Sequence, residues 1–159
     1  MAPLPQLIEE DIARLGVELR EMIGKSDATT ALIIDKGGFL ITSQGDAQQF
    51  DLTSIAALAS GAYMANQTIA NLVHETSFNS IYQQGEKFSM FVMSVDESCL
   101  LVVIFKAQVS VGAVKYFSTP AVKQIAAQLE IARERNPDAS LDLSEINLAD
   151  PSEVFKRKT

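Results

Sequence analysis

The chain has 159 residues, of which 13 are basic and 20 are acidic, and its formal net charge is −7. This length suits one folded domain with a core of its own. Nucleic acids and acidic membrane surfaces are bound through Lys and Arg, so an acidic chain with no basic stripe is not expected to bind either. The single cysteine, Cys99, excludes an internal disulfide and every cysteine-rich zinc site, and we expect a cytoplasmic protein.

Hydrophobic spacing and turn residues predict three helices and five strands. Helical spacing, N-cap residues and first-turn prolines mark the helices, whereas short apolar runs between turn residues mark the strands. The helices are expected at 6–23, 52–75 and 120–135, the strands at 31–35, 39–42, 87–95, 99–105 and 109–118, and one short helical turn at 78–82.

The resulting order, α-β-β-α-β-β-β-α, predicts an α/β domain with a five-stranded antiparallel sheet. The strand at 99–105, Cys-Leu-Leu-Val-Val-Ile-Phe, has no polar alternation and therefore needs apolar cover on both faces. We expect helices on both faces of this sheet. The folded domain is expected to span residues 1–135, and the acidic segment 136–159 is expected to be a mostly flexible tail with too few apolar residues to fold alone.

Residues with the chemistry for catalysis are scarce. His74 is the only histidine, which rules out a histidine metal cluster, and a structural role at the end of a helix is expected. Cys99 lies in the most apolar strand, where burial raises the pKa of a thiol and makes it unreactive. The glycine pair at 37–38 lacks the spacing of a phosphate-binding loop and is expected to form a turn, and the acidic run 9–11 is expected to be a solvated helix face. We therefore expect a protein that is not an enzyme and holds neither a metal nor a cofactor.

The long helix predicted from Leu52 has no charged side chain before Glu75, which is unusual for a helix on a protein surface. One broad side of this helix is apolar and is expected to cover the sheet. That side consists of Leu52, Ile55, Ala56, Leu58, Ala59, Ala62, Tyr63, Ile69, Ala70 and Val73.

The opposite side of the long helix holds small or flexible residues in place of the Lys and Glu that keep a helix face solvated. Charge depletion of this kind is typical of the centre of an interface. The side consists of Thr53, Ala57, Ser60, Gly61, Met64, Gln67, Thr68 and Asn71. We expect a partner to bind here, and cover by the chain's own tail is the alternative.

The strand expected at 87–95 is apolar on both faces and, as the first strand of a meander, is expected to lie at an edge of the sheet. An uncovered apolar edge promotes aggregation, so we expect two copies to pair edge to edge across a twofold axis. Such pairing makes the protein a homodimer and brings the two long helices side by side. The dimer interface is expected to contain Phe88, Met90, Phe91, Val92 and Met93.

Three segments, Leu32–Gly45, Asp51–Gly61 and Leu101–Lys115, carry a family likeness. Together they resemble the roadblock/dynein light chain domain family, and within it the bacterial MglB branch of polarity regulators. The resemblance covers about residues 6–135, with the family's order and similar loop lengths, and leaves the tail out. It implies a roadblock fold and a non-enzymatic homodimer that binds a Ras-like small GTPase of the MglA type, two regulator subunits to one GTPase.

In this branch, the regulators activate the GTPase by pressing on its switch regions without an arginine finger, and positioning supplies the gain in rate. The resemblance implies that Thr53, Ala57, Ser60, Gly61, Met64, Gln67 and Thr68 contact the GTPase. It also implies a contact from the C-terminal extension through Phe155, Lys156, Arg157 and Lys158. Two other functions stay open, a structural adaptor without effect on nucleotide turnover and a small-molecule sensor of the PAS or profilin-like type.

Overall fold

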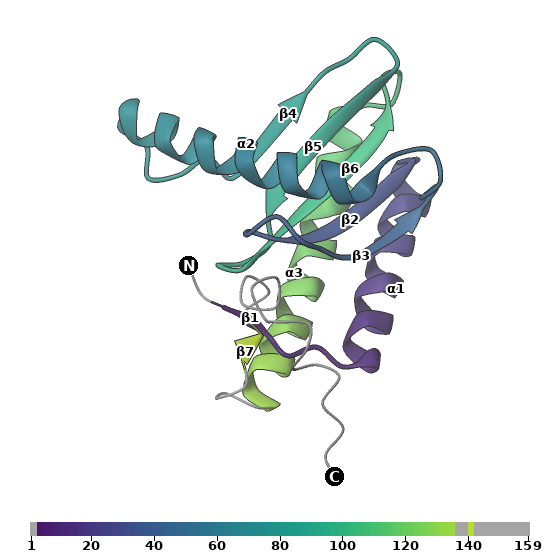
Figure 1. The fold of residues 1–159 in the computed structure, drawn as a ribbon. Coiled ribbons are helices and arrows are strands. Elements are labelled where there is room, and N and C mark those ends of the chain that lie inside the picture. Colours follow the sequence, from purple (N-terminus) through teal and green to yellow (C-terminus); the bar gives the residue numbers. More distant parts are fainter. Residues whose placement is uncertain (1–2, 136–139, 142–159) are drawn as a thin grey trace, which may run out of the picture.

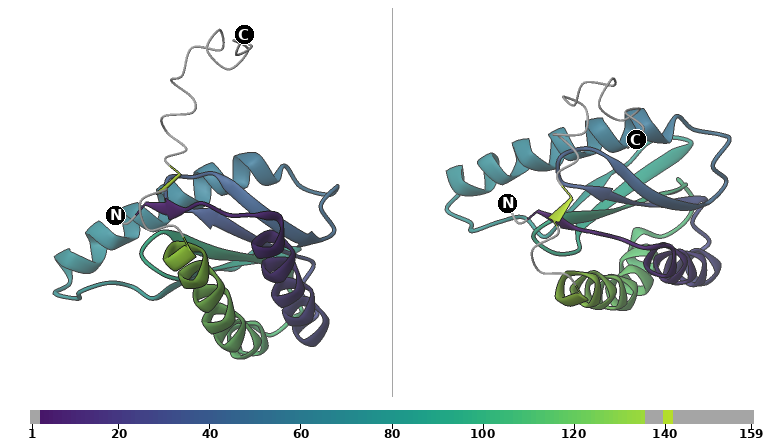
Figure 2. Two further views of the ribbon diagram at one scale, coloured as in Figure 1. Left: turned by 90° about the horizontal axis from the view of Figure 1, so that it is seen from below. Right: turned by 60° about the horizontal axis from the view of Figure 1, so that its bottom comes forward.

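The computed structural model describes residues 3–135 and 140–141. A five-stranded antiparallel sheet, in the order β3-β2-β6-β5-β4, lies between α2 on one face and α1 with α3 on the other (Figures 1 and 2). In chain order the elements are β1 (Leu4–Pro5), α1 (Glu9–Ser26), β2 (Thr30–Asp35), β3 (Leu40–Gly45), α2 (Leu52–Leu72), β4 (Ser80–Gln83), β5 (Phe88–Ser94), β6 (Cys99–Lys106), α3 (Val111–Arg135) and β7 (Ser140–Leu141). The predicted fold class is confirmed, with the main elements in the predicted order.

Strand β6 lies at the centre of the sheet and is buried on both faces from Cys99 to Phe105. The side chains of Cys99, Leu101, Val103 and Phe105 pack toward α1 and α3, whereas those of Leu100, Val102 and Ile104 pack toward α2. Figure 2 shows the blue α2 on one face of the sheet and the purple α1 and green α3 on the other. The absence of polar alternation in this strand therefore correctly predicted helices on both faces.

The segment 109–118 is not a strand, because most of it forms the first part of α3. The helix begins after Ser110, whose Oγ accepts a hydrogen bond from the backbone N–H of Ala113 at 3.4 Å. It continues through Pro120, which the sequence placed in the first turn of a shorter helix. The fifth strand of the sheet is instead β4, in the segment where a helical turn was predicted.

Strand β5 is not an edge strand. Its residues Met90–Met93 pair with β4, and the whole strand pairs with β6 on its other side. The predicted edge-to-edge pairing through Phe88, Met90, Phe91, Val92 and Met93 is therefore wrong, because the backbone groups of this strand already form ladders with two neighbours within one chain. The edge strands of this sheet are β3 and β4.

A buried carboxylate joins the start of α1 to the end of α3. Asp11 accepts hydrogen bonds from the backbone N–H of Ile8 at 2.9 Å, from Gln128 at 2.7 Å and from Arg135 at 2.8 and 3.0 Å. The Arg135 guanidinium holds the pKa of the Asp11 carboxyl well below its usual range. The expectation that the whole acidic run 9–11 is solvated is wrong at Asp11, which is fully buried.

The two ends of the described chain meet in a second, two-stranded sheet. Leu4 of β1 lies opposite Leu141 of β7, so that the chain pairs again beyond the predicted domain boundary at residue 135. The remainder of the tail, including the predicted contact residues Phe155, Lys156, Arg157 and Lys158, lies outside the described residues.

Candidate functional site: the exposed sides of α2

Helix α2 has well-defined ends. At its start, the Asp51 carboxylate accepts hydrogen bonds from the backbone N–H of Ser54 at 3.2 Å and from the Ser54 hydroxyl at 2.6 Å, and these bonds lower the pKa of Asp51. The helix ends at Leu72 rather than near Glu75, because His74 has a left-handed backbone with φ of 65°. The N-cap prediction is confirmed, and the C-terminus lies about one turn earlier than predicted.

The buried side of α2 is narrower than predicted. Leu52, Ala56, Ala59 and Tyr63 pack on the sheet, whereas after Tyr63 the only buried residue of the helix is Ala70. Figure 1 shows the C-terminal end of α2 projecting beyond the strands. More than half of the helix surface is therefore left without cover from the described part of the chain.

An apolar stripe runs along one exposed side of α2. Leu58 and Leu72 are 75% and 74% exposed, and Ile69 and Val73 are exposed as well. The prediction that Leu58, Ile69 and Val73 face the core is wrong, because all three side chains are exposed. We define the apolar stripe as Leu58, Ala62, Ala65, Ile69 and Leu72, which recur at intervals of three or four residues.

A small-residue stripe lies beside the apolar stripe on α2. It consists of Thr53, Ala57, Gly61, Met64 and Thr68, all of which are exposed as the sequence predicted. Two further predicted contact residues serve the fold. Ser60 is buried and its hydroxyl donates to the carbonyl of Lys36, so the expectation that it lies on the open side is wrong. Gln67 is half-buried, and its side-chain amide donates to the carbonyl of Phe78 at 3.1 Å.

Two turns at one end of the sheet flank the small-residue stripe. The turn between β2 and β3 packs closely on α2, since a Cβ at Gly38, whose φ is 101°, would lie 3.2 Å from the Cα of Ala57. The turn between β5 and β6 is joined to the β2–β3 turn by a hydrogen bond from the Lys36 backbone N–H to the Ser98 carbonyl at 2.8 Å. Hairpin turns were predicted, but their position beside α2 depends on the register of β2 and β6.

A groove of about 710 Å³ continues from the small-residue stripe toward these turns. Met64 and Gln67 form its wall on α2, while Lys36 and the acidic pair Asp96 and Glu97 supply charge from the turns. The Lys36 ammonium lies 5.5 Å from the centroid of the Tyr63 ring. An uncharged helix side is thus bordered by a groove that carries both signs of charge. Protein interfaces commonly have this pattern, with few charges at the centre and polar groups at the rim.

The residues with reactive side chains lie apart from this surface. Cys99 is fully buried, and burial raises the pKa of its thiol to about 12, so it is neutral at physiological pH. His74 is exposed in the turn after α2. Within residues 3–135 and 140–141, no group of three or more His, Cys, Asp or Glu side chains is placed to hold a metal ion. A search of the same residues finds no helix with the length and apolar character required to cross a membrane.

The three-layer fold and the uncharged, largely exposed α2 define a small α/β domain with a long apolar and polar helix on one face of its sheet. The chain belongs to the Roadblock/LC7 domain family, because the sequence pattern that defines this family matches residues 17–105. This membership confirms the family resemblance that the three segments of the sequence carry.

Several solved structures are similar to this chain. MglB from Myxococcus xanthus is 28% identical, with 80% of this chain and 96% of that chain covered and a TM-score of 0.74. The gliding protein MglB from Thermus thermophilus is also 28% identical, with 82% and 99% covered and a TM-score of 0.75. A structure of MglB with a tetrameric arrangement is 27% identical, with 83% and 99% covered and a TM-score of 0.77. Comparison with the curated proteins gives no match.

Proposed function

We propose that this protein is a non-enzymatic, homodimeric regulator of a Ras-like small GTPase of the MglA type and that it works in the cytoplasm. The observation that carries the proposal is α2, which is exposed along two stripes and has no charged side chain from Leu52 to Val73. Membership of the Roadblock/LC7 domain family and the similarity to MglB structures support it. Because one of these is a gliding protein, motility and cell polarity are the processes to examine first.

Two exposed stripes on one helix allow two different contacts. The apolar stripe is suited to a second copy of the chain, because large apolar side chains removed from water contribute about 1.5 to 3 kcal/mol each. The small-residue stripe is suited to the GTPase, since small side chains let another backbone approach closely. The adjoining groove, with Lys36, Asp96 and Glu97, extends this contact with polar groups.

The proposal is tested with an MglA-type GTPase from the same genome, loaded with a non-hydrolysable GTP analogue. The two proteins are expected to elute together in gel filtration, with two regulator subunits for each GTPase. With GTP bound, the regulator is expected to raise the rate of hydrolysis. A stable complex with an unchanged rate of hydrolysis would contradict activation and favour a structural adaptor, whereas failure to form a complex would contradict the proposal as a whole.

The dimer is expected to dissociate when charge is placed on the apolar stripe. Leu58→Glu together with Leu72→Glu puts two carboxylates where the second copy packs, and both positions are sufficiently exposed that the monomer should keep its fold. We expect the dissociation constant of the dimer to rise at least about a hundredfold, since an unpaired buried charge is strongly unfavourable. Sedimentation equilibrium measures this change.

Ile131→Glu on α3 is the matched control, because Ile131 is also an exposed large apolar residue but lies outside α2. This variant is expected to remain dimeric. If the double variant on α2 also stays dimeric, the copies meet elsewhere, and the assignment of the apolar stripe to the dimer is contradicted.

A further inference from the structure

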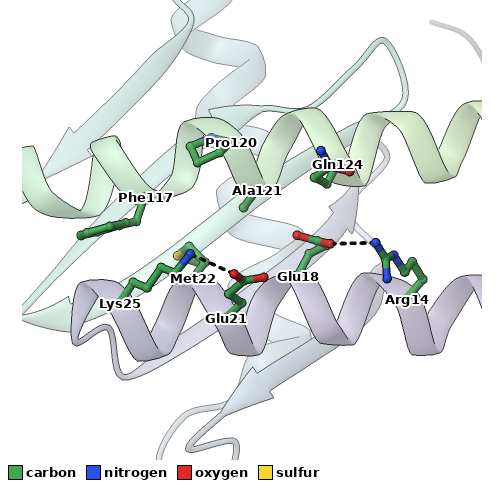
Figure 3. A pocket seen from close by; sticks show the side chains of 9 residues that line it. All are labelled: Arg14, Glu18, Glu21, Met22, Lys25, Phe117, Pro120, Ala121 and Gln124. Carbon is green, nitrogen blue, oxygen red and sulfur yellow. Dashed lines mark hydrogen bonds and ion pairs between the residues drawn. The ribbon is translucent and has the colours of Figure 1, made fainter.

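A second groove lies between α1 and α3, in the layer on the opposite face of the sheet from α2. Its volume is about 400 Å³. Figure 3 shows charged side chains of α1 along one wall and the uncharged side chains of Phe117, Pro120, Ala121 and Gln124 from α3 along the other. The charge of this groove therefore comes from one helix only.

The charges of α1 are arranged with carboxylates in the middle and cations at the two ends. Glu18 has a side chain that is only 11% exposed, and it forms an ion pair with Arg14 at 3.6 Å. Glu21 is more exposed and forms an ion pair with Lys25 at 2.9 Å. Arg14 and Lys25 are both more than half exposed, so their pairs contribute little to stability and the cations can move into solvent. The groove can then accept a positive charge from outside the chain.

An apolar hollow of about 490 Å³ continues this groove beside Lys25, Phe117 and Pro120. One of its walls is Tyr116, which is 72% exposed and stacks edge to face on Phe117 with ring centroids 5.1 Å apart. Glu21 and Lys25 are one helical turn apart on α1, so the hollow begins about one turn from the acidic centre. An anionic position and an apolar position at this spacing match two side chains on one face of a helix.

We infer that the groove between α1 and α3 binds an amphipathic helix of a protein partner. A Lys or Arg of that helix lies between Glu18 and Glu21, and a large apolar side chain three or four residues away fills the hollow against Phe117 and Pro120. This mode of binding, in which an amphipathic helix lays one face into a groove, recurs among protein recognition domains. It requires no contact with α2, so the site is independent of the proposed GTPase contact.

A second copy of this chain fits the groove poorly. Two α1 helices that pack antiparallel over the groove around a twofold axis place Arg14 of one copy opposite Lys25 of the other. In the same register Glu18 of one copy lies opposite Glu21 of the other. Like charges are thus brought together at every charged position of the groove, which disfavours the contact.

The test is a selection from a phage-displayed library of 16-residue helical peptides on the full-length protein, and the affinity of the enriched peptides is then measured for the unmodified protein and for the Glu21→Lys variant. Enriched peptides are expected to carry a Lys or Arg three or four residues from a large apolar residue. Their affinity for Glu21→Lys is expected to be at least about tenfold lower, and changing the basic residue of the peptide to Glu is expected to restore binding to this variant. Glu21 is exposed, so the variant should fold.

Glu134→Lys is the matched control, because it makes the same change of charge at an exposed position of α3 outside the groove. Peptide binding is expected to be unchanged in this variant and in Gly61→Arg on α2. The inference is overturned if no peptides are enriched, if the enriched peptides lack a basic residue, or if Glu21→Lys binds them as well as the unmodified protein. It is also overturned if the chain forms tetramers that Glu21→Lys abolishes, because a second copy then occupies the groove.

Discussion

Replacement of Gly61 by arginine is expected to abolish the complex with the GTPase while the fold and the dimer are retained. Gly61 lies on the small-residue stripe, and a Cβ added there meets no atom within 4 Å, so the single chain has room for the new side chain. Arginine also favours the helical conformation over glycine. In the complex, the same side chain keeps the partner backbone away and leaves a guanidinium without a partner in a desolvated contact. We expect the affinity to fall at least about a hundredfold.

The measurement is the binding of the GTPase, loaded with a fluorescent non-hydrolysable GTP analogue, by fluorescence anisotropy. Gly24→Arg is the matched control, since Gly24 is an exposed glycine of α1 where an added Cβ is equally free of neighbours. Met64 also belongs to the small-residue stripe, but it lies farther than Gly61 from the apolar stripe on the circumference of α2. Met64→Arg is therefore expected to weaken GTPase binding as Gly61→Arg does. If both α2 variants bind the GTPase normally, the small-residue stripe is not the contact; if Gly61→Arg also dissociates the dimer, Met64→Arg decides between the two causes.

The fold could be predicted largely because the sequence of β6 restricts where the helices can pack. A strand without polar alternation must be covered on both faces, and this requirement places helices on both sides of the sheet. The segment 109–118 was assigned wrongly because its valines and Phe117 favour a strand, while Pro120 resembles a helix start. Packing decides the outcome, since Val114, Ser118, Ala121 and Ile125 are all buried on one side of α3.

The edges of the sheet could not be predicted, because β4 carries almost no sequence signal. Its four residues, Ser-Ile-Tyr-Gln, contain only one aliphatic side chain, yet they pair with the middle of β5 and remove it from the edge. The expected route to a dimer was wrong for this reason. The apolar stripe of α2 was missed for a related reason, because helical periodicity gives the direction of an apolar side but not the width of the sheet beneath it.

For the candidate site, composition was the informative signal. The absence of charge from Leu52 to Val73 can be seen in the sequence, and the structure leaves most of that surface exposed. The neighbouring groove could not be predicted, since it depends on the pairing of Asp35 with Cys99 between β2 and β6. That register places Lys36 beside the turn that carries Asp96 and Glu97. Residues about 60 positions apart are thus joined by sheet geometry rather than by local sequence.

Asp11→Asn is expected to lower the free energy of unfolding by about 2 to 4 kcal/mol at neutral pH. The carboxylate is fully buried and accepts hydrogen bonds from Ile8, Gln128 and Arg135. An amide has one acceptor oxygen, and its NH₂ group would face donors, so several of these bonds cannot form. Denaturant unfolding followed by circular dichroism measures the change. Both the sheet between β1 and β7 and the packing of α1 on α3 are expected to loosen in the variant.

The pH dependence gives this prediction a second test. The pKa of Asp11 is lowered in the folded protein, chiefly by Arg135, so the unfolded chain binds a proton at this group more readily than the folded chain. The stabilisation is therefore fully present above the ordinary aspartate pKa of about 4 and is lost as the pH falls toward the lowered value. The difference in stability between the unmodified protein and Asp11→Asn is expected to shrink steadily as the pH is lowered from about 5 to about 2.

Glu9→Gln provides the matched control, because Glu9 belongs to the same acidic run in the first turn of α1 but is exposed. It is expected to change the stability little at any pH, since an exposed carboxylate near a helix N-terminus interacts weakly with the helix dipole. A loss of stability in Glu9→Gln as large as that in Asp11→Asn would show that helix charge, rather than the buried contact with Arg135, is responsible. A difference between the unmodified protein and Asp11→Asn that stays constant down to low pH would show that the carboxylate is not ionised in the folded protein, and the geometry at Arg135 would then have no electrostatic role.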